Sequence, residues 1–163
     1  MKATTMNETN GAATATTTDD DASPAPAARA CDVVGKLSIV VVDDHYLVRL
    51  GVQNIVELQC GFEVVGSAAN GEDAIAVVAK LQPKVVLMDV HMPRLNGIDA
   101  TRAIKAQWPH VFVIALTMYI DDATREAMFA AGASGFIDKA ALGVEICQTI
   151  SEVAVDGNRS TAS

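Results

Sequence analysis

Polar side chains of complementary kinds follow four short apolar runs of the sequence. The runs are residues 37–42 (LSIVVV), 85–88 (VVLM), 111–116 (VFVIAL) and 134–137 (SGFI). The polar residues that follow them are Asp43, Asp44, Asp89, Thr117, Asp138 and Lys139. Carboxylates are ligands for hard cations, and a hydroxyl and an ammonium group can contact the oxygens of a phosphoryl group. The residue types therefore predict a site for a metal ion and a phosphoryl group.

The composition of the four runs predicts buried strands that bring these polar groups together. In an open parallel α/β sheet, the carboxyl ends of the strands line one crevice, and ligands bind there. Residues as distant in sequence as Asp43 and Lys139 would then meet in one small volume.

Helical patterns separate the predicted strands. After Asp44, apolar residues occur at the spacing of a core-facing helix, at Val48, Val52, Ile55 and Val56. A strand is expected next over residues 62–66, followed by a helix that is capped by Asn70 and stopped by Pro83. A third helix is expected over residues 97–107, and a fourth runs from its cap Asp121 to Gly132. The last helix contains the apolar residues Leu142, Ile146, Ile150 and Val153. This alternation predicts an α/β fold, a doubly wound five-stranded parallel sheet with right-handed crossovers and helices on both faces.

The predicted cluster of Asp43, Asp44 and Asp89 requires a compensating charge. Carboxylates about 4 Å apart repel one another by several kcal/mol per pair at an effective dielectric constant near 20. A hard cation that keeps several waters and takes one or two carboxylates is Mg²⁺, and Mn²⁺ accepts the same ligands. We therefore expect a divalent cation, Mg²⁺ or Mn²⁺, at this site.

Composition excludes several classes of protein. The 20 acidic residues outnumber the 12 basic residues, so the chain would be repelled by DNA and is not expected to bind nucleic acid directly. The three cysteines, Cys31, Cys60 and Cys147, lack a CxxC spacing and are typical of reduced thiols. No apolar stretch approaches the roughly 18 residues that span a membrane, and the N-terminus does not resemble a signal peptide. We expect a cytoplasmic protein without a membrane partner.

The chain divides into three segments by composition. Residues 1–36 consist mainly of small and polar residues, which cannot bury enough apolar area to offset the entropy of ordering, so we expect a disordered low-complexity tail. Residues 37–155 contain the predicted strands and helices and are long enough for one domain. Residues 156–163 (DGNRSTAS) are expected to be a C-terminal tail or the start of a linker.

Four motifs in this order resemble the receiver domain of bacterial two-component response regulators. They are VVVDDH around Asp43, VLMDVHMPRLNG around Asp89, ALT ending at Thr117, and GFIDKA around Lys139. Each motif alone is weak, but each follows its own predicted strand. The resemblance covers residues 37 to about 155 and implies a flavodoxin-like strand order of 2-1-3-4-5.

The resemblance implies how the cation would be held and which residue would be phosphorylated. Asp44 and Asp89 would bind the cation directly, Asp43 would act mostly through water, and His91 would contribute its main-chain carbonyl oxygen. Asp89 would be the phosphoacceptor. A sensor histidine kinase or a phosphotransfer protein would donate the phosphoryl group from a phosphohistidine.

The resemblance also implies which residues would sense the phosphoryl group. Thr117 would donate a hydrogen bond to one phosphoryl oxygen, and Lys139 would neutralise another. Phe136, the aromatic residue three positions before Lys139, would change rotamer with Thr117 and switch the surface of the fourth helix, the fifth strand and the fifth helix. Many relatives carry Tyr at this position, and Phe lacks its hydroxyl. We therefore hypothesise that the inward rotamer of Phe136 is favoured.

The residues beside the nucleophile bear on the lifetime of the predicted aspartyl phosphate. His91 and Tyr119 lie two residues beyond Asp89 and Thr117, where side chains flank the path of the hydrolytic water. Both side chains are bulky, and Met118 is larger than the small residue often found there. We expect a phosphoryl group that persists for minutes or longer.

The GFIDKA motif places Ala140 where many receivers have proline and is similar to the LuxR-type transcription-factor subfamily. Receivers of that subfamily precede a helix-turn-helix domain and can form homodimers on phosphorylation. The eight residues 156–163 cannot form a recognition helix. The sequence is therefore expected either to regulate transcription through a DNA-binding domain outside this chain or to act as a stand-alone regulator.

Three other interpretations remain open. A phosphatase of the haloacid dehalogenase kind also uses an Asp nucleophile after a strand, but that family has a second Asp where this chain has His91. A pseudo-receiver binds partners without being phosphorylated. The presence of the full set of Asp43, Asp44, Asp89, Thr117 and Lys139 argues against this interpretation, because a pseudo-receiver does not require it. A flavodoxin would need a Ser/Thr/Gly-rich phosphate loop after the first strand, and this chain has DDHYLV there. The chain is expected to be a signalling domain rather than an enzyme.

Overall fold

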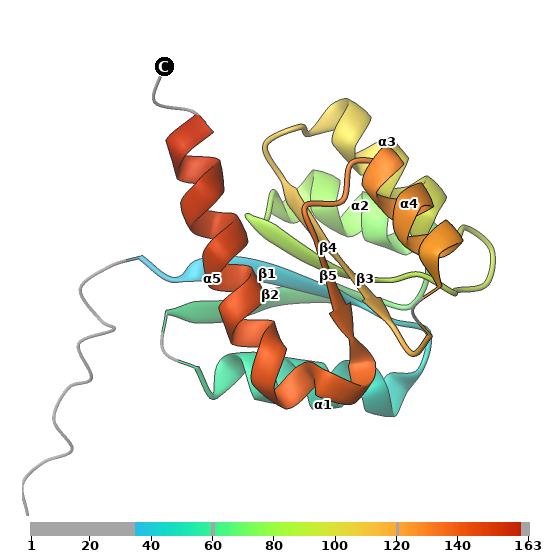
Figure 1. The fold of residues 1–163 in the computed structure, drawn as a ribbon. Coiled ribbons are helices and arrows are strands. Elements are labelled where there is room, and N and C mark those ends of the chain that lie inside the picture. The colour runs from blue at the N-terminus through green and yellow to red at the C-terminus, as the bar shows by residue number, and fades with distance from the viewer. Residues whose placement is uncertain (1–34, 60, 120, 161–163) are drawn as a thin grey trace, which may run out of the picture.

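Five parallel strands form the centre of the structure, a computed structural model that describes residues 35–59, 61–119 and 121–160. The strands are β1 (Leu37–Val42), β2 (Phe62–Ala68), β3 (Val85–Asp89), β4 (Phe112–Thr117) and β5 (Gly135–Asp138). They pair in the order β2-β1-β3-β4-β5 (Figure 1). The predicted doubly wound α/β fold and its strand order are confirmed. Residues 1–34, most of the segment predicted to be a disordered tail, lie outside the described residues.

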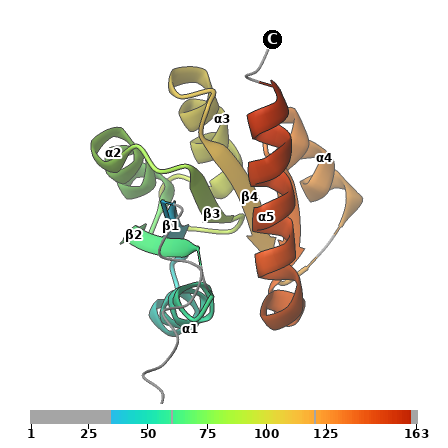
Figure 2. The same cartoon turned by 90° about the vertical axis from the view of Figure 1, so that its left-hand side faces the viewer.

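Helices cover both faces of the sheet (Figures 1 and 2). The helices are α1 (Tyr46–Glu57), α2 (Gly71–Leu81), α3 (Gly97–Gln107), α4 (Asp122–Ala130) and α5 (Leu142–Ser160). Side chains that alternate along β1 enter different cores: Ile39 and Val41 pack with α1 and α5, and Val40 and Val42 pack with α2 and α3. This alternation explains why the central strands are continuous apolar runs, since both of their faces are buried.

Side-chain caps begin three of the helices. The Asn70 side chain accepts a hydrogen bond from the Asp73 N–H, and the Asp121 side chain accepts one from the Thr124 N–H. Asn96 does the same for α3 by accepting from the Asp99 N–H. The predicted caps at Asn70 and Asp121 are confirmed. These contacts satisfy N–H groups that have no partner within the helix.

Two helices end at residues other than those predicted. The α4 helix ends at Ala130 rather than at Gly132, because the chain turns there and Gly132 adopts a φ of 102°. The α5 helix continues to Ser160, so residues 156–160, predicted to be tail or linker, form its last turns. Residues 142–160 contain no proline, and Gly157 alone does not stop a helix. Among the described residues, no helix is long and apolar enough to cross a bilayer.

Close packing at Gly97 joins the start of α3 to the end of β3. The Gly97 N–H donates a 3.0 Å hydrogen bond to the Val90 carbonyl oxygen. A Cβ atom at residue 97 would lie only 2.0 Å from the Asp89 carbonyl oxygen. Because this neighbour is backbone, a side chain at residue 97 would displace the end of the strand that carries Asp89.

Gly97→Ala is predicted to lower the free energy of unfolding by about 2 kcal/mol or more, because the added methyl group overlaps the Asp89 backbone. Urea denaturation measures the change. Gly51→Ala on α1 is the matched control, since a Cβ there meets no atom within 4 Å. The control is expected to be neutral or to stabilise by about 0.5–1 kcal/mol. Equal stability of the two variants would contradict the prediction.

Candidate functional site

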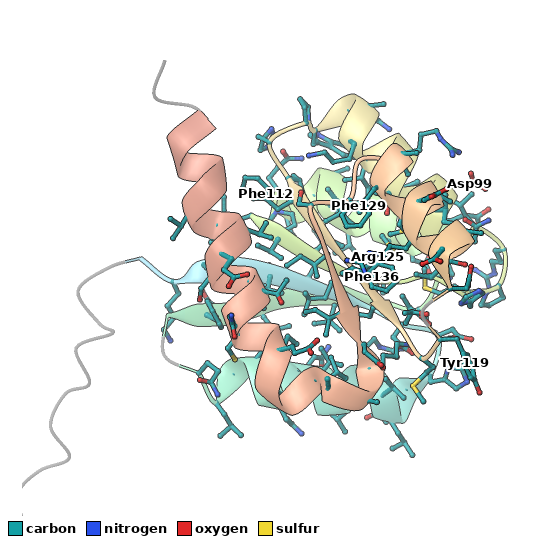
Figure 3. All side chains as sticks on the ribbon, in the orientation of Figure 1. Asp99, Phe112, Tyr119, Arg125, Phe129 and Phe136 are labelled. Atoms are coloured by element: carbon teal, nitrogen blue, oxygen red, sulfur yellow. The ribbon has the colours of Figure 1, made fainter. Side chains whose placement is uncertain are left out.

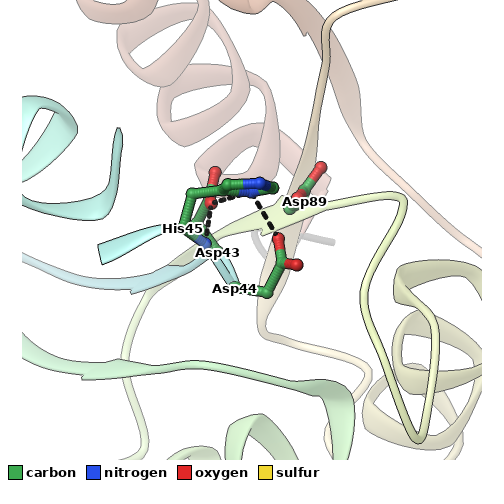
Figure 4. A group of neighbouring side chains, drawn as sticks. All are labelled: Asp43, Asp44, His45 and Asp89. Carbon is green, nitrogen blue, oxygen red and sulfur yellow. Dashed lines mark hydrogen bonds and ion pairs between the residues drawn. The ribbon is translucent and has the colours of Figure 1, made fainter. Parts of the chain in front are cut away.

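The sequence-predicted site residues lie at the carboxyl edge of the sheet. Asp43 and Asp44 directly follow β1, and Asp89 ends β3. Thr117 ends β4 beside Asp138 of β5, and Lys139 follows immediately. The structure brings one ligand atom each from Asp43, Asp44, Asp89 and the unpredicted His45 within 4.8 Å of one another (Figure 4). Parallel pairing with the observed register thus assembles residues from distant parts of the chain.

Lys139 connects the two most buried carboxylates. Its Nζ lies 2.6 Å from Oδ2 of Asp43 and 3.0 Å from Oδ1 of Asp89. The three side chains are 5%, 0% and 5% exposed, so solvent screens these ion pairs only weakly. Lys139 is therefore a buried ammonium group paired with two carboxylates rather than a solvated surface charge.

Burial raises the pKa of Asp89 above its ordinary value. The ion pair with Lys139 and the His91 N–H oppose this shift, and the neighbouring Asp43 carboxylate adds to it. The His91 N–H lies 3.4 Å from Oδ1 of Asp89. The ionised form of Asp89 is therefore under-stabilised in the metal-free protein, a condition typical of functional carboxylates.

The carboxylates keep acceptor capacity that the described residues do not use. Oδ2 of Asp43 and Oδ1 of Asp44 are buried and have no aligned hydrogen bond among those residues, although Lys139 lies beside the first and His45 beside the second. When Asp43, Asp44 and Asp89 are all ionised, the single charge of Lys139 leaves two negative charges uncompensated. Oxygen ligands with an excess of two negative charges fit a divalent cation.

The loop that carries the acidic pair is held by contacts that sequence reasoning missed. The Arg49 guanidinium donates a 2.5 Å hydrogen bond to the Asp43 carbonyl oxygen, and the His45 N–H donates one of 2.8 Å to Oδ1 of Asp43. Arg49 lies in the first turns of α1, where the α1 dipole favours an acidic residue over a cation. That mismatch is visible in the sequence, but it does not identify the partner of Arg49.

The Thr117 hydroxyl is engaged with its own loop. It donates a 2.9 Å hydrogen bond to the Tyr119 carbonyl oxygen and accepts a 3.2 Å hydrogen bond from the Tyr119 N–H. Thr117 itself is buried, whereas the Tyr119 side chain is 79% exposed. A ligand that accepts a hydrogen bond from the hydroxyl must therefore replace the Tyr119 carbonyl oxygen, whereas the bond from the Tyr119 N–H can remain.

Phe136 of β5 is half-buried between the sheet and α4. It packs against the buried cluster of Val90, Ala115, Met128 and Ala133. The Arg125 guanidinium lies 5.8 Å from the centre of the Phe136 ring, and Figure 3 labels both residues. The ring thus contacts α4, and its strand β5 leads directly into Lys139.

Comparison with known proteins gives a consistent family. The model of the response regulator receiver domain matches residues 39–151. The transcriptional regulatory protein DegU of Brevibacillus brevis is 37% identical over 122 residues, which are 75% of this chain and 52% of DegU. The response regulator UvrY of Escherichia coli K12 is 38% identical over 127 residues, 78% of this chain and 58% of UvrY.

A solved structure agrees with these relatives. The crystal structure of a LuxR-family two-component response regulator from Aurantimonas sp. SI85-9A1 matches with a TM-score of 0.72 and 32% identity, over 75% of this chain and 87% of that one. The chain spans about half the length of the curated relatives it matches. The matched region contains the site residues from Asp43 to Lys139, and on this evidence the chain belongs to the family of response regulator receiver domains.

Proposed function

We propose that this chain is the phosphoacceptor domain of a two-component signalling system and that Asp89 accepts the phosphoryl group. The observation that carries the proposal is the buried Asp89 carboxylate, which shares Lys139 with Asp43 and has a raised pKa. A sensor histidine kinase or a phosphotransfer protein supplies the phosphoryl group from a phosphohistidine. Mg²⁺ or Mn²⁺ is required.

In the transfer step, a carboxylate oxygen of Asp89 attacks phosphorus, and the bond from phosphorus to the histidine nitrogen breaks. The imidazole leaves with the electron pair of that bond and recovers a proton from water. Asp44, Asp89 and the His91 main-chain carbonyl oxygen would hold the cation, and Asp43 would act mostly through water. When bound, the cation neutralises charge on the phosphoryl oxygens. Lys139, already next to Asp89, neutralises a further phosphoryl oxygen.

The phosphoryl group then changes the balance between two packings of the domain. Thr117 exchanges the hydrogen bond that it donates to Tyr119 for one to a phosphoryl oxygen, and the rotamer in which Phe136 packs against α4 becomes more populated. The affected surface is that of α4, β5 and α5. The domain regulates transcription through a DNA-binding domain outside this chain and forms a homodimer on phosphorylation. Support for this output comes from DegU, which is named a transcriptional regulatory protein.

Asp89→Asn is predicted to abolish the formation of an acid-stable, base-labile adduct when the protein is incubated with Mg²⁺ and acetyl phosphate. The amide cannot act as the nucleophile, although it fills nearly the same space. Intact-protein mass spectrometry measures the added phosphoryl group. Glu72→Gln, at an exposed position of α2, is the charge-matched control and should react like the wild type. An adduct that persists in Asp89→Asn would assign the reaction to another residue.

Asp89→Asn is also predicted to raise the Tm of the metal-free protein by a few degrees, about 3 °C, at pH 7. Because its folded-state pKa is raised, Asp89 contributes most stability below the ordinary carboxyl pKa of about 3.9, and this contribution is lost as pH rises through the raised pKa. The difference in Tm should therefore shrink toward pH 4. Scanning calorimetry in EDTA tests this, and a lower Tm for the variant at pH 7 would refute it.

The Phe136 ring is predicted to stay against α4 in the Mg²⁺-loaded protein without phosphate. Its packing against Met128 and Ala115 and the missing hydroxyl both favour this rotamer. NMR should show nuclear Overhauser contacts from the Phe136 ring to the Met128 and Ala115 methyl groups, and Phe136→Tyr should weaken them. The ring contacts of Phe112 serve as an internal reference. Spectra in which Phe136 lacks both contacts would exclude the hypothesis.

A further inference from the structure

The imidazole of His45 lies among the carboxylates of the site. Its Nδ1 is 2.8 Å from Oδ1 of Asp44 and 3.7 Å from Oδ1 of Asp43. One ligand atom from each of these three residues and one from Asp89 lie within 4.8 Å of one another, and Figure 4 marks the contacts of the His45 ring with Asp43 and Asp44. Sequence reasoning considered His91 at this site and did not consider His45.

The contact between His45 and Asp44 does not have the geometry of a hydrogen bond. Oδ1 of Asp44 is buried and lacks an aligned donor among the described residues, despite the nearby ring nitrogen. His45 is the N-cap residue of α1, yet its side chain makes no capping hydrogen bond within the described part of the chain. The ring nitrogen thus lies at ion-pair distance from an oxygen that has no aligned donor among the described residues.

The distances suit two ligands of one cation. For metal–ligand bonds of about 2.1 Å, adjacent ligand atoms of an octahedral site are about 3.0 Å apart and opposite ones about 4.2 Å. The separations of 2.8 Å and 3.7 Å are close to this range, and the 4.8 Å limit requires only a small inward movement. The backbone is already restrained there by the hydrogen bonds to Asp43 from Arg49 and from His45 itself.

We propose that the His45 imidazole is a direct ligand of the cation and makes the site selective for first-row transition ions over Mg²⁺. Carboxylates alone suit Mg²⁺, Ca²⁺ and Mn²⁺, whereas an imidazole nitrogen favours later ions such as Co²⁺, Ni²⁺ and Zn²⁺. The His45 side chain is 72% exposed, so a hydrated ion can reach it directly from solvent. This inference rests on the proposed function, because it uses the same acidic cluster.

Calorimetric titration of the full chain with Co²⁺ and with Mg²⁺ measures the selectivity. His45→Gln removes the imidazole and keeps a polar side chain of similar size, so the ratio of the Mg²⁺ Kd to the Co²⁺ Kd should fall by about tenfold. His110→Gln is the matched control, because His110 is exposed at the turn that precedes β4. This control should keep the wild-type ratio. An unchanged ratio in His45→Gln would overturn the inference.

Pulsed electron paramagnetic resonance of bound Mn²⁺ identifies the ligand directly. The wild type should show coupling of Mn²⁺ to a ¹⁴N nucleus, which His45→Gln should lose and His91→Gln should keep. If only His91→Gln lost the coupling, the coupled nitrogen would belong to His91 rather than to His45, and the inference would be overturned. If the wild type binds Mg²⁺ and accepts phosphate from acetyl phosphate without any nitrogen coupling, only this inference fails. If neither Mg²⁺ nor Co²⁺ binds, the proposed function fails with it.

Discussion

The excess of carboxylates over ammonium groups around the buried Lys139 is the constraint on which the arrangement of this domain depends. The ammonium group of Lys139 contacts two carboxylates that are almost removed from solvent, and a third carboxylate lies beside them. Burying such a group of charges is unfavourable unless geometry is good or another cation compensates. The protein accepts this cost at the edge of the sheet, where a cation can enter, and the two apolar cores on either face of the sheet supply the stability that offsets it.

The topology follows from the need to bring those charges together. Asp43, Asp89 and Lys139 meet because β1, β3 and β5 run parallel and end at one edge, with β4 between the last two. Helical crossovers make parallel pairing possible, and each crossover returns the chain to the start of the next strand. Close contact between Gly97 and the Asp89 backbone holds the beginning of α3 against the strand end. The position of the Asp89 carboxylate therefore depends on close backbone packing as well as on the charges around it.

Much of this arrangement could be predicted from local patterns. The strands are apolar and β-branched, the helices have a regular apolar spacing, and Asn70 and Asp121 are recognisable caps, so the fold and the edge that carries the polar residues followed from short segments. His45 and Arg49 could not be assigned in this way, because their roles depend on the direction in which a side chain leaves the backbone. The hydrogen bonds between Thr117 and Tyr119 depend equally on one turn. The end of α5 was missed because no residue there forbids further helix.

The length of α5 has a mechanical consequence. The helix begins directly after the turn that carries Lys139 and continues for 19 residues. At 1.5 Å per residue it is about 28 Å long, so a tilt of about one degree at its base displaces its far end by about 0.5 Å. Because the helix begins next to Lys139, a rotation about its first residues moves its last residues the most. Small adjustments at the charged cluster are thereby amplified at the opposite end of the molecule.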